Sequence, residues 1–319
     1  MHSLAEGTDF IYDPSEYESG APLSRFAALR SSAPVIWIDE KSLEHWPGGD
    51  GFWIILSHAL CTEALKNTAV FSSNLQGTQL RNPANGEDLG YVQEMMLNMD
   101  PPDHSRLRRH LVGAFTSKAI GVLEQKISQH AKSIIDEVII RYPTGECDFV
   151  TDIAADLPLR CLADIFGIPS EDRYLMYDWA NRVIGYQDPD YAKSFSFDIK
   201  SGSAMAREAI MHRPKPDENG KMPDPRSRSG MNDLYCYAHL LAKHRRKNPK
   251  DDVISILLTQ LDNDEEKLNI SEFENMFWLF MVAGNETLRN GIPGGMIALL
   301  QHPKSWEQLH SSPQLMPNA

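Results

Sequence analysis

The run from Phe280 to Thr287 places a glycine, an acid and a hydroxyl inside a long apolar segment of the kind that forms a buried helix. Glycine in a helix interior costs about 1 kcal/mol relative to alanine. A buried carboxylate is also costly unless a partner or a function requires it. Two destabilising residues close together, the glycine and the acid, favour a functional site. In such a site Glu286 can donate a proton and the Thr287 hydroxyl can form hydrogen bonds.

The periodicity of this run predicts which of its side chains share a face. Phe280, Ala283, Gly284 and Thr287 are expected on one stripe of a helix. The small Ala-Gly step predicts a groove that admits a small ligand. The hydroxyl of Thr287 is expected to bond a carbonyl one turn earlier. The competing interpretation is a core helix with an incidental polar notch.

A second group of residues lies upstream, between Leu97 and Arg109. The Pro101-Pro102 pair ends one segment, and the next residues begin a helix. His104 and Arg108 are four residues apart, so they project from one face and can bind a carboxylate or a phosphate. Without further context, this spacing is more typical of a solvated helix face.

Together, the Asp-Pro-Pro-x-His-x-Arg-Leu-Arg-Arg run and the Ala-Gly-x-Glu-Thr run resemble motifs of the cytochrome P450 monooxygenases. The resemblance implies a mainly α fold with a small β-sheet region. It implies that His104 and Arg108 bind the propionates of haem b, and that Leu97 and Phe115 pack on the porphyrin.

The resemblance also assigns roles to the long helix. Ala283 and Gly284 would form the oxygen-binding groove. Glu286 would relay protons, as an acid whose pKa is raised by burial. Thr287 would hold a water beside the bound oxygen. The position after Thr287 is Leu288, where many relatives have a second hydroxyl.

The similarity is to bacterial members that oxidise steroid side chains and methyl-branched lipids. It implies hydroxylation of a large apolar substrate (a steroid, terpenoid or branched lipid) with O2 and two electrons from a ferredoxin and its reductase. Phe280, Val282 and Ala283 would line the substrate site. Arg106, Arg109 and Lys118, a separate basic group, would face an acidic ferredoxin.

Two further family motifs, a Glu-x-x-Arg helix and a Cys-containing haem loop, do not occur in the 319 residues. We therefore expect a single cytochrome P450 domain over 1–319 that lacks its C-terminal part, with the axial cysteine beyond Ala319. If the chain truly ends at Ala319, the alternatives are a haem-free, non-catalytic protein that binds an apolar ligand, or a product without a stable fold.

Composition narrows the possible functions. The net charge of −13 argues against general nucleic-acid binding. No apolar run approaches the roughly 18 residues of a membrane span, and Met1 to Asp13 is polar, without the apolar core expected of a signal sequence. The cysteines at 61, 147, 161 and 236 are scattered, which predicts free thiols in the cytoplasm and no zinc site or disulfide.

The predicted elements that position these residues are mainly helices. A β-ribbon is expected from strands at 34–38 and 51–56, and Ser57 is expected to cap a helix to 65. Residues 74–91 are predicted to be loop. Proline-rich residues 212–230 indicate either a surface loop or a lid. Further helices are predicted at 103–115, 117–141, 151–166 (capped by Thr151), 171–184, 251–260 and 272–301 (capped by Ser271), with another starting at Pro303.

Overall fold

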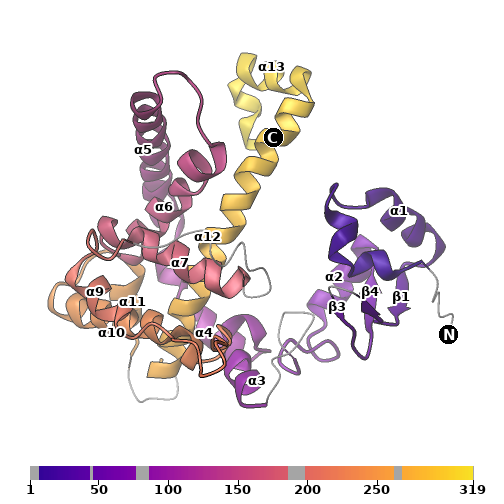
Figure 1. The fold of residues 1–319 in the computed structure, drawn as a ribbon, viewed down its shortest axis with the longest axis horizontal. Coiled ribbons are helices and arrows are strands. Elements are labelled where there is room, and N and C mark those ends of the chain that lie inside the picture. The colour runs from indigo at the N-terminus through magenta and orange to yellow at the C-terminus, as the bar shows by residue number, and fades with distance from the viewer. Residues whose placement is uncertain (1–6, 44–45, 77–85, 186–197, 262–267, 319) are drawn as a thin grey trace. The chain divides into compact units, whose positions relative to one another are not determined.

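The computed structural model describes residues 7–43, 46–76, 86–185, 198–261 and 268–318. The described chain is mainly helical with small antiparallel sheets, which confirms the predicted fold class (Figure 1). Contacts divide it into two compact units, Met1–Ser72 and Ser73–Ala319. The assignment of 1–319 to one domain stays a prediction.

The first unit contains the predicted ribbon. Strands β1 (Val35–Ile38) and β4 (Phe52–Ile55) pair antiparallel, with Ile36 opposite Ile54. Ile36 and Ile38 are buried in a small core with Tyr12. The residues between these strands form a second ribbon that was not predicted. The remaining elements of this unit are α1 (Leu23–Ser32), α2 (His58–Lys66), β2 (Ser42–Leu43) and β3 (Trp46–Pro47).

Helix α2 begins as predicted, because the Ser57 side chain accepts a hydrogen bond from the backbone N–H of Leu60.

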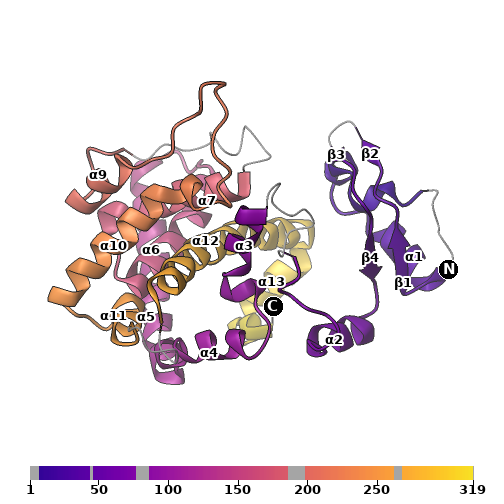
Figure 2. The same cartoon turned by 90° about the horizontal axis from the view of Figure 1, so that it is seen from below.

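The second unit is built from helices around α12, which is the longest described (Figures 1 and 2). Helix α12 contacts α6, α7 and α10, and the aromatic side chains of Trp179, Tyr237 and Phe277 meet in the core between them. The bounds are α3 (Gly86–Gln93), α4 (Asp103–Arg109), α5 (Ser117–Arg141), α6 (Asp156–Phe166), α7 (Arg173–Ile184), α9 (Ala204–Ile210), α10 (Asn232–Lys247), α11 (Val253–Thr259), α12 (Ile270–Gln301) and α13 (Pro303–Ser311).

Helix α12 begins at Ile270, two residues before the predicted start at Glu272, and its cap differs from the prediction. Asn269 is the cap: its side chain accepts from the N–H of Glu272, and the Glu272 carboxylate bonds back to the N–H of Asn269. Ser271, the predicted cap, lies inside the helix, and its hydroxyl bonds Glu94 at 2.7 Å. A reciprocal capping box satisfies two free N–H groups, which a lone serine does not.

Three further predictions of local structure were wrong. Part of the predicted loop at 74–91 is helix α3, while 77–85 lies outside the described residues. The predicted helix 103–115 ends at Arg109, and a separate 3-10 turn covers Val112–Phe115. Thr151 lies within a π-helical turn at Val150–Ala154, whose start is capped by the Asp148 side chain.

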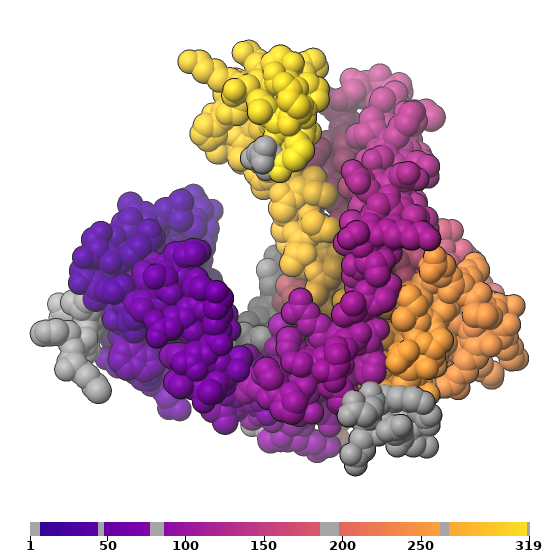
Figure 3. All heavy atoms as spheres, turned by 180° about the vertical axis from the view of Figure 1, so that it is seen from behind, coloured from indigo at the N-terminus to yellow at the C-terminus, as the bar shows by residue number. Residues whose placement is uncertain are grey.

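Helix α5 has the predicted bounds but buries little of its apolar stripe. Of the apolar positions that define the stripe, only Ile134 is buried, and Ile120 is 52% exposed. The second half of α12 is similar, with Leu288 and Leu300 exposed. In Figure 3 this part of α12 and α13, coloured yellow, lies beside α5. None of the helices in the described ranges is both long and apolar enough to cross a bilayer.

Candidate functional site

The polar notch of α12 has one exposed edge. Ala283 and Thr287 are both exposed, and the Thr287 hydroxyl donates to the Ala283 carbonyl at 2.9 Å, as predicted. Because the hydroxyl hydrogen is used in this bond, the oxygen lone pairs remain available as acceptors. The edge can therefore hold a hydrogen-bonding ligand, such as a water.

Gly284 does not share this exposed edge. A Cβ atom at Gly284 would lie 2.7 Å from Cδ2 of Leu162, so the glycine allows α12 to pack closely on α6. Successive helical residues are rotated by about 100° around the axis, so Ala283 and Gly284 face different neighbours. The predicted stripe is thus split between an open edge and a helix contact.

Glu286 lies on the buried side of the helix, 8% exposed, inside a polar network. Its carboxylate bonds the guanidinium of Arg289, and it also accepts from the Asn290 amide at 2.7 Å. Burial raises the pKa of Glu286 and outweighs the lowering by Asn290, which is the direction predicted. Burial lowers the pKa of Arg289. The acid is therefore fixed in position and disposed to hold a proton.

This network reaches a second helix that the prediction did not include. Arg289 is 3% exposed, and it donates to the side-chain oxygen of Asn181 on α7 at 2.8 Å. Its guanidinium also lies 4.3 Å from the ring centre of Tyr177. The spacing of Glu286 and Arg289 was a usable signal, since residues three apart on a helix are neighbours. Asn181 is 108 positions away and gave no such signal.

His104 and Arg108 lie on α4 as predicted. His104 is half-buried and Arg108 is exposed. Across the described residues, neither side chain forms an ion pair or hydrogen bond. Two cationic or polar donors on one helix face, without protein partners, suit an anionic group of a ligand.

Exposed apolar side chains flank these donors. Leu97 precedes α4 and is 51% exposed; Phe115 follows it and is 41% exposed. Phe115 stacks on Phe280 of α12 at 6.4 Å between ring centres, which brings the two predicted segments together. Uncovered apolar surface beside two free donors fits a large apolar ring system that carries carboxylates, as haem does.

The predicted substrate-lining residues do not share one environment. Ala283 is exposed, Phe280 is half-buried against Phe115 and Phe166, and Val282 is 7% exposed within the main core. Val282 is therefore a packing residue in this structure, because its place on the helix turns it away from the edge that bears Ala283.

None of the four cysteines lies on α4 or α12, the helices that carry the predicted site residues. All four are free thiols, as predicted. Burial raises the pKa of Cys161 to about 11 and also raises the pKa of Cys236. Among the described residues, no group of three or more His, Cys, Asp or Glu side chains could hold a metal ion.

The predicted basic docking group is only partly available. Arg106 forms an ion pair with Glu272, with its side chain 20% exposed, so it ties α4 to the start of α12. Arg109 is exposed and makes no ion pair with any described residue. Lys118 is exposed at the start of α5.

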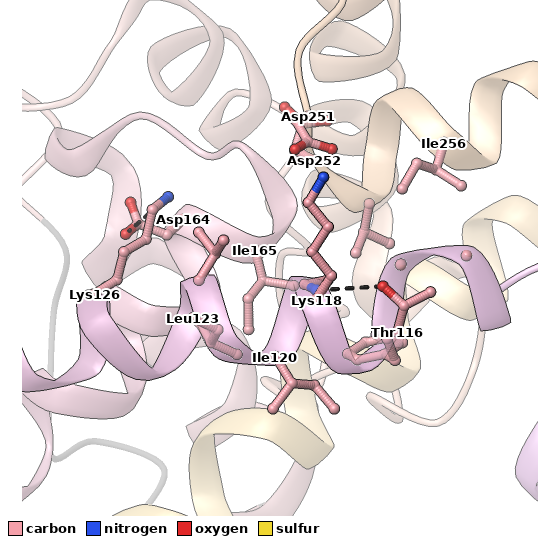
Figure 4. A pocket seen from close by; sticks show the side chains of 16 residues that line it. Thr116, Lys118, Ile120, Leu123, Lys126, Asp164, Ile165, Asp251, Asp252 and Ile256 are labelled. Carbon is pink, nitrogen blue, oxygen red and sulfur yellow. Dashed lines mark hydrogen bonds and ion pairs between the residues drawn. The ribbon is translucent and has the colours of Figure 1, made fainter.

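A pocket of about 310 Å³ lies away from the notch, where α5 meets α6 and α11 (Figure 4). Apolar residues such as Leu123, Ile165 and Ile256 line it, and Lys118 extends over it toward Asp251 and Asp252. Its lining includes Phe115 but neither the acid nor the hydroxyl of α12, so the pocket and the predicted chemistry do not coincide.

Comparisons place the chain beside known proteins. No family model matches it. It is 34% identical over 311 residues to a steroid C26-monooxygenase of Mycobacterium tuberculosis, covering 96% of this chain and 63% of that protein. It is 30% identical to cytochrome P450 126 of the same organism, covering 97% of this chain and 67% of that protein.

Comparison with solved structures also finds cytochrome P450s. The chain is similar to a Mycobacterium marinum cytochrome P450 in complex with pseudoionone, with 29% identity and a TM-score of 0.64. The similarity covers 95% of this chain and 64% of that chain. The chain thus spans somewhat under two thirds of the length of the steroid C26-monooxygenase that it matches.

Proposed function

The chain belongs to the cytochrome P450 family, and from this premise we propose that the complete protein is a monooxygenase that hydroxylates a large apolar substrate with O2. The observation that carries this proposal is an exposed hydroxyl edge beside a buried acid on α12. Thr287 lies on the exposed edge, and Glu286, one residue earlier, is buried with a raised pKa.

A haem b fits the residues around this edge. When bound, haem would supply the binding and reduction of O2 at its iron. His104 and Arg108 would hold its propionates through charge-assisted hydrogen bonds. Leu97 and Phe115 would cover part of its apolar surface, which they leave exposed in the described structure. Ala283, with its single methyl group, would leave room next to the ring.

Glu286 would donate the proton, and Thr287 would hold the water that carries it. Burial raises the pKa of Glu286 and so favours its protonated form, while Arg289 and Asn290 fix its orientation. Thr287 donates to Ala283 and so keeps its lone pairs free to accept a hydrogen bond from a water. A water held at Thr287 would carry the proton from the buried acid to the open edge.

The substrate class proposed is a steroid or a branched lipid. One relative is named a steroid C26-monooxygenase, and the exposed edge next to Phe280 is apolar apart from Thr287. A steroid presents a large rigid apolar surface, which suits contact with an aromatic side chain and a methyl group. Val282 is not included in this site, because it is buried in the core.

A ferredoxin is the proposed electron donor. Arg109 and Lys118 are exposed cations on neighbouring segments of the second unit, and they suit an acidic partner. Arg106 is left out of this surface because it is paired with Glu272. None of the described contacts favours the haem-free alternative.

Replacing His104 and Arg108 together by glutamine is expected to weaken haem retention by about tenfold or more, because two charge-assisted bonds are lost. The absorbance of the reduced, carbon-monoxide-treated complete protein measures this, since thiolate-bound haem gives a strongly red-shifted Soret band. The Arg109→Gln variant is the control for lost charge. Full haem retention in the double variant would contradict the propionate assignment, and a complete protein without that band would contradict the proposed function.

Replacing Thr287 by alanine is expected to uncouple O2 consumption from product formation. The variant keeps the helix but lacks the hydroxyl that orients a water, so more of the oxygen should leave as hydrogen peroxide. Peroxide released per O2 consumed is the measurement. Thr287→Ser, which keeps the hydroxyl, should restore most of the coupling. Equal coupling in the alanine variant would rule out the role given to Thr287.

A further inference from the structure

Three buried polar atoms have no hydrogen-bond partner among the described residues where α3, α10 and α12 meet. They are the hydroxyl oxygens of Tyr91 on α3 and Tyr235 on α10, and Oδ1 of Asn275 on α12. The rings of Tyr91 and Tyr235 lie edge to face, 6.4 Å apart between centres, and Tyr235 and Asn275 are each 3% exposed. A buried polar atom without a partner is costly, so three of them in one region indicate a binding site for a polar group.

The amide of Asn275 has a fixed orientation. Its nitrogen donates to Oε2 of Glu94, just beyond α3, at 3.4 Å, and the same oxygen accepts from the Ser271 hydroxyl at 2.7 Å. Because an ionised carboxylate only accepts hydrogen bonds, the amide nitrogen must face Glu94 and the amide oxygen must face away from it. Oδ1 of Asn275 can only accept, so a ligand must bring a donor to it.

The two phenols complement this acceptor. Burial raises the pKa of Tyr91, so its hydroxyl keeps its hydrogen. A phenol hydroxyl can both donate and accept. A ligand hydroxyl therefore satisfies both kinds of partner, because it donates to Asn275 and accepts from a phenol. A ketone oxygen can accept from a phenol but leaves Oδ1 of Asn275 without a partner.

A polar groove of about 830 Å³ lies beside these atoms, and its charge disfavours an anionic ligand. Tyr91 lines the groove. Arg228 is the only cation among the described residues of its lining, and it already bonds Glu274. The acids of the lining are Glu87, Asp88, Glu94 and Glu274. A carboxylate or sulfate at this end of a ligand would meet like charge, so an uncharged hydroxyl is favoured.

A row of side chains on α12 connects Asn275 to the exposed hydroxyl edge. Residues four apart form one ridge of a helix, and this ridge consists of Asn275, Leu279, Ala283 and Thr287. Leu279 is half-buried and Ala283 is exposed, so the middle of the ridge is apolar and partly open. With a rise of about 1.5 Å per residue, the ridge is about 18 Å long. A steroid nucleus with an extended side chain has this length.

We propose that Asn275, Tyr91 and Tyr235 form a hydroxyl anchor that binds the ring hydroxyl of a steroid substrate. The steroid lies along the ridge, with its ring hydroxyl at Asn275 and the end of its side chain at Thr287. This rests on the proposed function, because the carbon at Thr287 is the one that is hydroxylated. The anchor atoms are shielded from solvent, and rotation of the half-buried Tyr91 side chain admits the ligand.

The hydroxyl anchor narrows the proposed substrate class. Steroids and branched lipids both present apolar surface, but a branched fatty acid would bring a carboxylate to a groove that is lined by acids. A steroid with a ring hydroxyl brings the donor that Asn275 lacks. The anchor therefore selects a hydroxysteroid and determines which end of it reaches Thr287.

Three ligands that differ only at the ring oxygen test the anchor: cholestanol has a hydroxyl, cholestanone has a ketone, and cholestane has no oxygen. Their dissociation constants with the complete, haem-loaded protein are measured by quenching of tryptophan fluorescence, without an electron donor. Cholestanol is expected to bind about tenfold more tightly than cholestanone, since only the hydroxyl gives Oδ1 of Asn275 a donor. Equal affinities for all three ligands would assign the three atoms to bound water and overturn the anchor.

Variants locate the preference for the hydroxyl. Asn275→Leu, which keeps the size of the side chain, should abolish this preference and leave the affinity for cholestane unchanged. Tyr91→Phe and Tyr235→Phe keep their rings, and each should weaken the binding of cholestanol alone. Tyr142→Phe is the matched control, because its hydroxyl bonds Asp152 at 3.0 Å at the end of α5. A preference for cholestanol that survives in Asn275→Leu, or in both phenylalanine variants if the leucine variant does not fold, would contradict the proposal.

Turnover distinguishes failure of the anchor from failure of the proposed function. If cholestanol binds through Asn275 but no product forms with O2 and electrons, the hydroxyl anchor stands and the monooxygenase proposal fails. If steroids are hydroxylated but the three ligands bind equally, the monooxygenase proposal stands and the anchor fails. If both hold, the wild type should oxidise the end of the cholestanol side chain, and Asn275→Leu should give a mixture of positions.

Discussion

Replacing Glu286 by glutamine is expected to lower the rate of product formation by the complete protein by about 10²- to 10³-fold, the contribution typical of a positioned general acid. Glutamine has nearly the same size and its side-chain oxygen can still accept from Asn290 and Arg289, so the geometry of the network should be kept although the ion pair to Arg289 is lost. It cannot release a proton to a water at Thr287. Oxygen and substrate binding should change little, because neither is assigned to this carboxyl.

The pH dependence gives a second measurement of the same role. Burial raises the pKa of Glu286, so the neutral acid persists to higher pH than for an ordinary glutamate. Wild-type turnover should fall as pH rises through this raised pKa, because the proton donor is then lost. The glutamine variant should lack that decline. A variant with the wild-type rate and the wild-type pH profile would exclude Glu286 as the donor.

Glu307→Gln is the matched control, since Glu307 is an exposed acid on α13 and its loss removes the same charge. Asn181→Ala separates orientation from proton donation. It removes the α7 partner of Arg289 at 2.8 Å while leaving the Glu286 carboxyl in place. We expect a smaller loss of turnover in this variant, with the pH-dependent decline retained.

Local patterns were sufficient for much of the fold. The bounds of α5 and the start of α13 follow from 3- and 4-residue periodicity and from a proline at a first helical position. The β1–β4 ribbon follows from two β-branched and aromatic runs around a glycine-rich turn. These signals lie within a few residues of the elements that they predict.

Other elements depend on contacts that no local pattern contains. Helix α3 includes two glycines, which disfavour a helix, yet Val92 is buried and Tyr91 packs on Tyr235 of α10 at 6.4 Å. Tertiary packing thus overrides a weak propensity. The pairing of Arg106 with Glu272 joins residues 166 positions apart, so the sequence could not indicate that this arginine is unavailable to a partner.

In the candidate site, too, some features follow from local patterns and others depend on contacts between distant residues. The Thr287–Ala283 bond and the raised pKa of Glu286 follow from helix geometry and burial, and both were predicted. The environment of Gly284 was not, because periodicity identifies neighbours on a helix but not the element that each face meets. Only the approach of Leu162 shows that this glycine serves the contact between α6 and α12.

Replacing Asp252 by alanine is expected to destabilise the protein by about 3–5 kcal/mol, the cost of leaving a buried charge without its partner. Asp252 lies 2.5 Å from Nε of Arg245, and both residues are 5% exposed. Asp252 also caps α11 by accepting from the N–H of Ser255 at 2.7 Å, which is worth about 1 kcal/mol more. Urea unfolding of the complete protein measures the loss.

The large effect is expected because three helices meet at this ion pair. Arg245 on α10 also bonds the carbonyl of Gly167, which ends α6 in a left-handed conformation with φ of 68°. A Cβ atom at Gly167 would lie 2.0 Å from the Asp252 carboxylate, so the acid fills the space that the glycine leaves. Removing the carboxylate therefore loosens the end of α6, the start of α11 and the side chain of Arg245 together.

Asp251→Ala is the matched control. The carboxylate of Asp251 is exposed, so its removal should change the free energy of unfolding by less than about 0.5 kcal/mol. The double variant Arg245→Met with Asp252→Ala should recover part of the loss, since methionine leaves no buried charge without a partner. If Asp252→Ala and Asp251→Ala destabilise equally, the ion pair does not hold these helices together. If the double variant is less stable than Asp252→Ala, packing by the arginine stem matters more than its charge.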